Sequence, residues 1–185
     1  MLSLFVVGLS IKILDDYLDG DDSAGQPNLA CLMDRGVVAY ALFFYAVGAW
    51  LRPGWAFTLF LASYATGMLG SSHWILPSGF PAWVEVVVAL VLGLCLAGWH
   101  ELLSSVVLIF GIQLWDDVLD RAKDEKTGLR VNLAQKWGVV EASLAGLALL
   151  TTAVLLAPLK MLLTCLVLPL VLHVARYPWG KEGSV

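Results

Sequence analysis

The sequence is poor in charged residues and in cysteine, and each shortage excludes a class of protein. Only 14% of the 185 residues are charged and 59% are hydrophobic, whereas soluble domains are about a quarter charged. The same balance excludes an intrinsically disordered chain, which needs low hydrophobicity and high charge. The cysteines are odd in number and widely spaced, so they predict neither a disulfide framework nor a zinc site: they are Cys31, Cys95 and Cys165.

The sequence also has no basic stripe. The formal net charge is −4, so we do not expect nucleic acid as a partner. No positively charged segment precedes the first apolar run, which is therefore not typical of a secretory signal peptide. Together these absences predict an integral membrane protein.

Long apolar runs dominate the chain. A transmembrane helix needs about 20 mostly apolar residues, and turn signals or isolated charges separate the runs. We therefore expect an all-α, multi-pass transmembrane bundle of about seven helices, which forms a single domain over residues 1–185. The expected spans are Met1–Leu18, Gly36–Leu51, Gly54–Gly70, Pro81–Trp99, Leu102–Val118, Gly138–Ala157 and Leu159–Ala175.

The acidic residues are concentrated in two similar segments. Each segment has Asp-Asp-x-x-Asp near the end of an expected helix, then Asn-Leu-Ala, then a helix that begins with Gly-Val-Val. The first aspartate motif is Asp15-Asp16-x-x-Asp19, and the second aspartate motif is Asp116-Asp117-x-x-Asp120. This match predicts two parallel pseudo-repeats, with halves at about 1–80 and 81–185.

The order of the expected helices places both motifs on one face of the membrane, because an even number of crossings separates their ends. Most of the lysines and arginines lie on that same face. By the positive-inside rule we expect the acidic loops to be cytoplasmic. The functional site is then expected between the two halves, on the cytoplasmic side.

The spacing of the aspartates indicates a metal. On a helix, residues i and i+4 share a face, so Asp15 and Asp19 would lie one turn apart, as would Asp116 and Asp120. Carboxylates at this spacing repel each other, and Mg²⁺ commonly binds one or two carboxylates plus substrate phosphates. Two such clusters favour a Mg²⁺–diphosphate site. The plainer interpretation is that these acids are solvated at the ends of helices.

The second segment resembles an Asp-rich motif of the UbiA superfamily of intramembrane prenyltransferases. It reads Asp116-x-x-x-Asp120-x-x-x-Asp124, then Lys126-Thr127, then Asn132-Leu133-Ala134 before a helix led by Gly138. The first motif, with Asp22, is similar to the family's first motif, although Ile11 stands where the family usually has Asn. The resemblance covers most of the chain. Two of the family's nine helices, the first and the last, have no counterpart among the expected helices.

The resemblance implies a Mg²⁺-dependent prenyltransferase that moves a polyprenyl group from its diphosphate to an unidentified acceptor. It implies three sets of residues. The catalytic set is Asp15, Asp19, Asp116 and Asp120; these four also hold Mg²⁺, supported by Asp16, Asp22, Asp117 and Asp124; and Arg121, Lys123 and Lys126 contact the diphosphate. The lipid bilayer is the surrounding partner, and an oligomer or a partner subunit is compatible with the short chain.

Two other functions stay open. The short helix count and the absent Asn are compatible with a non-catalytic relative that binds prenyl diphosphates, or with a subunit that depends on a partner. Paired acidic motifs also fit a cation transporter. Such transporters, however, place carboxylates near the bilayer midplane, often on inverted repeats.

Overall fold

A computed structural model of the chain describes residues 1–18, 29–68, 75–76, 78–127 and 132–176, without the side chains of residues 31, 34, 122–127 and 176. Over these residues the regular structure is helical, apart from one isolated bridge between Ile75 and Pro81. The expected all-α class is confirmed. The chain forms two compact units. Unit 1 comprises residues 1–56 and the stretch from Leu162 onward, and unit 2 comprises residues 57–161.

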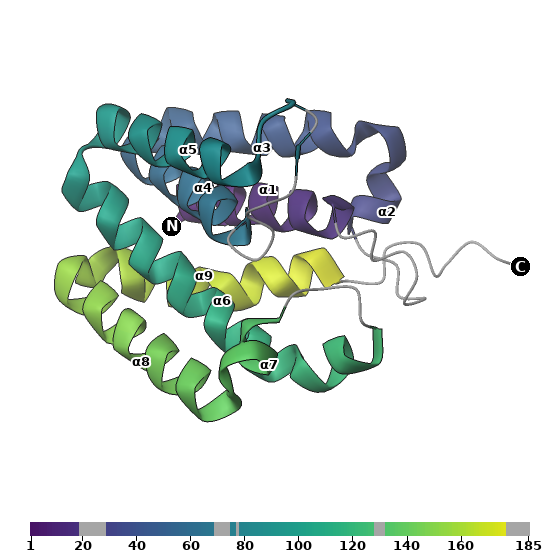
Figure 1. The fold of residues 1–185 in the computed structure, drawn as a ribbon. Coiled ribbons are helices and arrows are strands. Elements are labelled where there is room, and N and C mark those ends of the chain that lie inside the picture. Colours follow the sequence, from purple (N-terminus) through teal and green to yellow (C-terminus); the bar gives the residue numbers. More distant parts are fainter. Residues whose placement is uncertain (19–28, 69–74, 77, 128–131, 177–185) are drawn as a thin grey trace, which may run out of the picture. The chain divides into compact units, whose positions relative to one another are not determined.

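In unit 1, helix α1 (Leu2–Leu18) packs along helix α3 (Val37–Leu51), as Figure 1 shows. Between them come the short helix α2 (Leu29–Met33) and a single 3₁₀ turn, η2 (Asp34–Gly36). Helix α3 ends because Pro53 follows Arg52, and a residue before proline is driven out of the helical region; Arg52 has φ −153°. The buried core is apolar: Leu9, Ile13, Leu29, Ala30, Val37 and Ala41.

Two serine hydroxyls join α1 to the backbone of α3. Ser3 Oγ donates a hydrogen bond of 2.9 Å to the carbonyl oxygen of Gly48, and Ser10 Oγ donates one of 2.8 Å to that of Ala41. Both serines are buried. Small residues with such hydrogen bonds are typical of helix pairs in membranes, where close backbone approach replaces the hydrophobic driving force.

Unit 2 is built around helix α6 (Trp99–Thr127), which packs along helix α8 (Val139–Leu156). The short helix α7 (Leu133–Trp137) contacts both. Helix α5 (Ala82–Ala97) precedes α6, and helices α4 (Pro53–Gly67) and α9 (Pro158–Arg176) each contribute residues to both units. The two units thus share an order of elements, which is a helix that carries an aspartate motif, a short helix and a helix packed against the first.

Two boundaries of the expected spans were wrong. Trp99 begins α6 rather than ending α5. Gly98 separates the two helices because it has φ +82°, a backbone conformation that favours glycine. Helix α6 continues to Thr127, well past the expected end at Val118. The expected span ended near the first charged residues of the motif. Ala, Lys, Glu and Arg are all good helix formers, so the helix continues past them.

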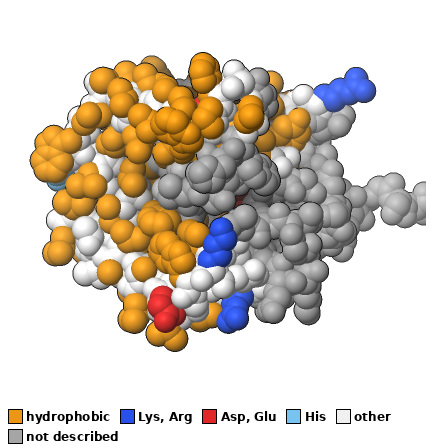
Figure 2. Space-filling model, viewed as in Figure 1, with side chains coloured by type: hydrophobic (Ala, Val, Ile, Leu, Met, Phe, Trp, Pro, Cys, Tyr) orange, Lys and Arg blue, Asp and Glu red, His pale blue; other side chains and the backbone are white. Residues whose placement is uncertain are grey.

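Three of the described helices are long and apolar enough to cross a membrane, judged by length and composition: Trp99–Arg121, Val139–Leu156 and Pro158–Ala175. Val37–Leu51 and Ala82–Ala97 are shorter apolar helices. Large hydrophobic side chains such as Trp50 and Leu155 are exposed, and hydrophobic side chains make up much of the described surface in Figure 2. These features are compatible with insertion in a bilayer. The count of seven spans stays a prediction.

The close approach of α1 and α3 generates the first prediction. A Cβ atom at Gly48 would lie 2.3 Å from Cγ2 of Val7, and a β-branched side chain in a helix has little freedom to move away. We expect Gly48→Ala to lower the free energy of unfolding in detergent by about 1–3 kcal/mol, the usual cost of overpacking.

Gly54→Ala is the matched control, because a Cβ atom there meets nothing within 4 Å. It should leave the stability unchanged or raise it slightly, since alanine favours the helix. Equal melting temperatures for Gly48→Ala and the parent protein would show that α1 and α3 do not pack as described.

Candidate functional site

The described part of the first aspartate motif is held by an ion pair within α1. Lys12 Nζ lies 2.8 Å from Asp16 Oδ1 and 3.3 Å from Asp15 Oδ2. Asp16 is buried, with 6% of its surface exposed, whereas Asp15 is exposed. Both acids lie in the last turn of the helix, where the backbone dipole disfavours negative charge. The ammonium group of Lys12 offsets that cost. Asp19 and Asp22 lie outside the described residues.

The second aspartate motif lies along α6 rather than at its end. Asp116 and Arg121 are exposed, and Asp117 and Asp120 are half-buried. Asp116 and Asp120 are one turn apart on one face of the helix. The backbone of α6 also carries three further predicted residues, whose side chains lie outside the described part: Lys123, Asp124 and Lys126.

Asp117 joins α6 to the short helix α7. Its carboxylate Oδ2 accepts a hydrogen bond of 2.8 Å from the backbone N–H of Leu133, and its carbonyl oxygen accepts one of 2.8 Å from Nδ2 of Asn132. Asn132 Oδ1 in turn accepts from the N–H of Gln135 at 3.1 Å and caps α7. Asp117 is predicted to support a metal, and its carboxylate also holds the start of α7 against α6.

Mg²⁺ prefers hard oxygen ligands such as carboxylates. No group of three or more His, Cys, Asp or Glu side chains that could hold a metal ion is present among the described residues. Two carboxylates with substrate phosphates can suffice for Mg²⁺, so Asp116 and Asp120 fit that requirement by type and spacing. The described acids of the first motif fit it less well, because both already pair with the ammonium group of Lys12.

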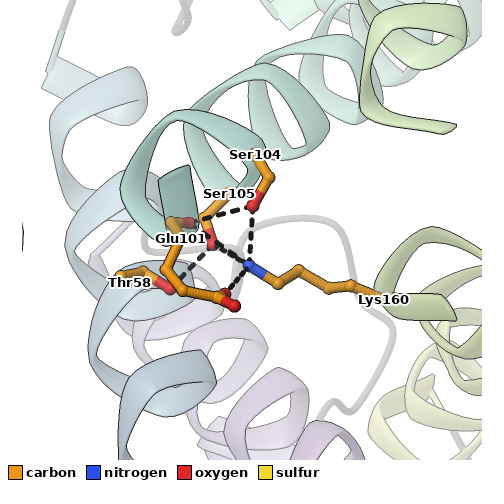
Figure 3. Close-up of polar contacts among 5 residues, drawn as sticks. All are labelled: Thr58, Glu101, Ser104, Ser105 and Lys160. Carbon is orange, nitrogen blue, oxygen red and sulfur yellow. Dashed lines mark hydrogen bonds and ion pairs between the residues drawn. The ribbon is translucent and has the colours of Figure 1, made fainter. Parts of the chain in front are cut away.

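A second polar cluster lies on α4, α6 and α9, within unit 2 (Figure 3). Lys160 is 1% exposed. Its Nζ lies 2.6 Å from Oε2 of Glu101 and donates hydrogen bonds to Ser104 Oγ at 2.9 Å and Ser105 Oγ at 3.1 Å. Ser105 Oγ also donates to Thr58 Oγ1 at 2.8 Å. A buried ammonium is tolerated only when it is paired and hydrogen-bonded in this way.

Sequence reasoning missed both lysine ion pairs, although the signals were present. Lys12 precedes Asp15 and Asp16 by three and four residues, which is the spacing of neighbours on a helix. Glu101, Ser104 and Ser105 have the same spacing on α6. Their partner Lys160 comes from a distant part of the chain, so only the fold could supply that contact.

The role of Asp117 can be separated from a metal-binding role. Asp117→Ala removes the acceptor for the Leu133 N–H, and we expect it to destabilise the α7 region by about 1–2 kcal/mol, as loss of a hydrogen bond to a charged acceptor does. Asp117→Asn keeps a side-chain oxygen and should retain most of that stability. Hydrogen exchange at the amides of residues 133–137 reports the difference. Equal protection in the two variants would contradict this role.

The Lys160 cluster predicts a strong coupling between two residues. Lys160→Met leaves the Glu101 carboxylate without its partner ammonium, so the single change should cost more than the double change Lys160→Met with Glu101→Leu. We expect a coupling free energy of about 1–3 kcal/mol in a double-mutant cycle, read from unfolding in detergent. Additive effects of the two changes would show that the pair contributes nothing to stability.

Comparisons with protein-family models, curated proteins and solved structures find no match to this chain. The relationship to UbiA-type prenyltransferases stays a prediction from the two aspartate motifs.

Proposed function

We propose that the chain is a Mg²⁺-dependent, UbiA-like membrane prenyltransferase, which moves a polyprenyl group from its diphosphate to an acceptor. The observation that carries this proposal is the second aspartate motif. It presents Asp116 and Asp120 on successive turns of α6, beside an exposed Arg121 and near the end of Trp99–Arg121, a stretch long and apolar enough to cross a membrane.

The arrangement suits a lipid diphosphate because it combines two chemistries on one helix. An apolar stretch can solvate a prenyl chain, and the acidic and basic residues that follow can bind a charged head. When bound, Mg²⁺ would neutralise the charge that develops on the leaving diphosphate. The side chains proposed to hold Mg²⁺ are Asp116 and Asp120 in the second motif and Asp15 and Asp19 in the first.

The remaining proposed residues have supporting roles. Arg121, Lys123 and Lys126 would take up charge on the diphosphate, because donors aimed at a developing anion stabilise it. Asp117 keeps α7 against α6 through Leu133 and Asn132, which makes it a positioning residue in this proposal. Asp16, Asp22 and Asp124 complete the proposed set around the metal.

The same proposal includes the topology. It takes the chain as a multi-pass protein with about seven spans, two parallel pseudo-repeats and both acidic loops on the cytoplasmic side. The shared order of elements supports the repeat, since α1, α2 and α3 follow one another as α6, α7 and α8 do.

One observation favours a second candidate function, a non-catalytic relative that binds prenyl diphosphates. Asp15 and Asp16 are already paired with Lys12, which weakens the case for two equivalent metal clusters. A protein with one functional cluster could bind the diphosphate without cleaving it. Binding and turnover must therefore be measured separately.

The test of the proposal uses geranylgeranyl diphosphate and the full chain in detergent. We expect this probe to raise the melting temperature in the presence of Mg²⁺ and not in the presence of EDTA. Asp116→Asn should weaken Mg²⁺-dependent binding at least roughly tenfold, because loss of even an outer-shell partner of a metal ligand commonly costs that much in affinity. Release of diphosphate on addition of candidate acceptors then reports turnover.

Glu141→Gln is the matched control, since Glu141 is an exposed acid at the start of α8 outside both motifs. It should bind the probe as the parent protein does. Binding without release of diphosphate would favour the non-catalytic candidate. The absence of any Mg²⁺-dependent shift in the parent protein would overturn both.

A further inference from the structure

Helix α9 begins with a charge that its position disfavours. Lys160 lies in the first turn of α9, which starts at Pro158, and the positive end of a helix dipole repels an ammonium group there. The side chain is also 1% exposed, so water does not solvate it. A buried ammonium is costly unless it is both paired and hydrogen-bonded. The groups around Lys160 must therefore offset two unfavourable terms.

Four oxygen atoms surround the ammonium group (Figure 3). Nζ lies 2.6 Å from Oε2 of Glu101, and it donates hydrogen bonds to Ser104 Oγ at 2.9 Å, Ser105 Oγ at 3.1 Å and the carbonyl oxygen of Glu101 at 3.2 Å. An ammonium group has three N–H donors. The Oε2 atom is itself buried and receives no hydrogen bond in the described part of the chain, so it contributes through its charge.

The hydroxyl groups of the cluster are oriented by bonds that do not involve lysine. Ser104 Oγ donates to the carbonyl oxygen of Glu101 at 3.0 Å, and Ser105 Oγ donates to Thr58 Oγ1 at 2.8 Å. Ser104, Ser105 and Thr58 are all buried. A hydroxyl group whose hydrogen is committed to another acceptor presents its lone pairs to a donor. Helices α6 and α4 therefore supply a set of acceptors that is already arranged for a cation.

We propose that α6 and α4 form a binding site for a primary ammonium group, and that Lys160 is the ligand that fills it. The chemistry favours an ammonium over a divalent metal. The contact distances of 2.6–3.2 Å exceed the roughly 2.0–2.1 Å that Mg²⁺ requires, and a carboxylate supplies only one of the four oxygens. This inference goes beyond the proposed function and does not depend on the aspartate motifs.

The inference differs from an ordinary ion pair in one testable respect. A site that is formed by α6 and α4 should bind an ammonium group that is not attached to α9. Lys160→Ala removes the end of the side chain, which has the composition of n-propylammonium. That ion should therefore enter the vacated site and restore stability to the variant.

The experiment compares melting temperatures of the full-length Lys160→Ala protein in detergent with n-propylammonium chloride or tetramethylammonium chloride. The two cations carry the same charge, but only the first has N–H groups. At about ten times its dissociation constant, n-propylammonium should raise the melting temperature by roughly 3–6 °C. Tetramethylammonium should not raise it. The parent protein should not distinguish the two salts, because its site is already filled.

Three further variants test the parts of the site. Lys160→Met fills the same volume without a charge and should show no selective response. Glu101→Gln added to Lys160→Ala removes the negative charge and should abolish the response. Ser105→Ala added to Lys160→Ala removes one acceptor and should weaken the binding of n-propylammonium at least about tenfold, because a hydrogen bond to a charged group commonly contributes that much.

A selective response of Lys160→Ala that is lost with Glu101→Gln would support the site. Equal responses to the two salts, or the same response in Lys160→Met, would overturn it. So would a selective response that survives Glu101→Gln. A Lys160→Ala protein that cannot be recovered folded even with n-propylammonium present would also overturn it, because the site would then not form without the lysine. Neither Mg²⁺ nor a diphosphate is present in these measurements, so their outcome is independent of the proposed function.

Discussion

Charged groups that leave water must be paired, and this constraint accounts for the best-defined polar contacts in both units. In unit 1 the buried Asp16 is paired with Lys12, and in unit 2 the buried Lys160 is paired with Glu101. The cost of an unpaired ion in an apolar medium is far larger than the net stability of a protein. The Lys12 pair lies within α1, whereas the Lys160 pair joins α9 to α6.

The helices themselves were largely predictable, because their signals are local. Apolar runs and breakers such as Pro53 identify where α1, α3, α8 and α9 lie, and the structure agrees to within a few residues. The errors occurred at α6. Its apolar run ends near Asp116, but helix formation depends on backbone propensity as well as hydrophobicity, so the helix continues through the charged residues to Thr127.

The candidate site was predictable only in part, because a motif specifies residue types and not their contacts. The i and i+4 spacing of Asp116 and Asp120 follows from helix geometry alone. The contact between Asp117 and Leu133 depends on how the chain returns after α6, and no local pattern encodes it. Lys12 lies within one turn of Asp15 and Asp16, but a lysine is not part of a metal-ligand pattern, so that pattern does not predict the ion pair.

The length of α6 sets how deep its charged residues can lie in a bilayer. At 1.5 Å per residue its 29 residues extend about 43 Å, whereas the hydrocarbon core is about 30 Å thick. Trp99 and Asp116 are separated by about 26 Å on the same scale. Where α6 crosses a bilayer with Trp99 at one edge of the hydrocarbon core, Asp116 lies just inside the opposite edge, and Asp120, about 6 Å further along the helix, lies at the headgroup layer. A lipid whose charged head lies in that layer can approach these carboxylates by lateral diffusion, without leaving the membrane.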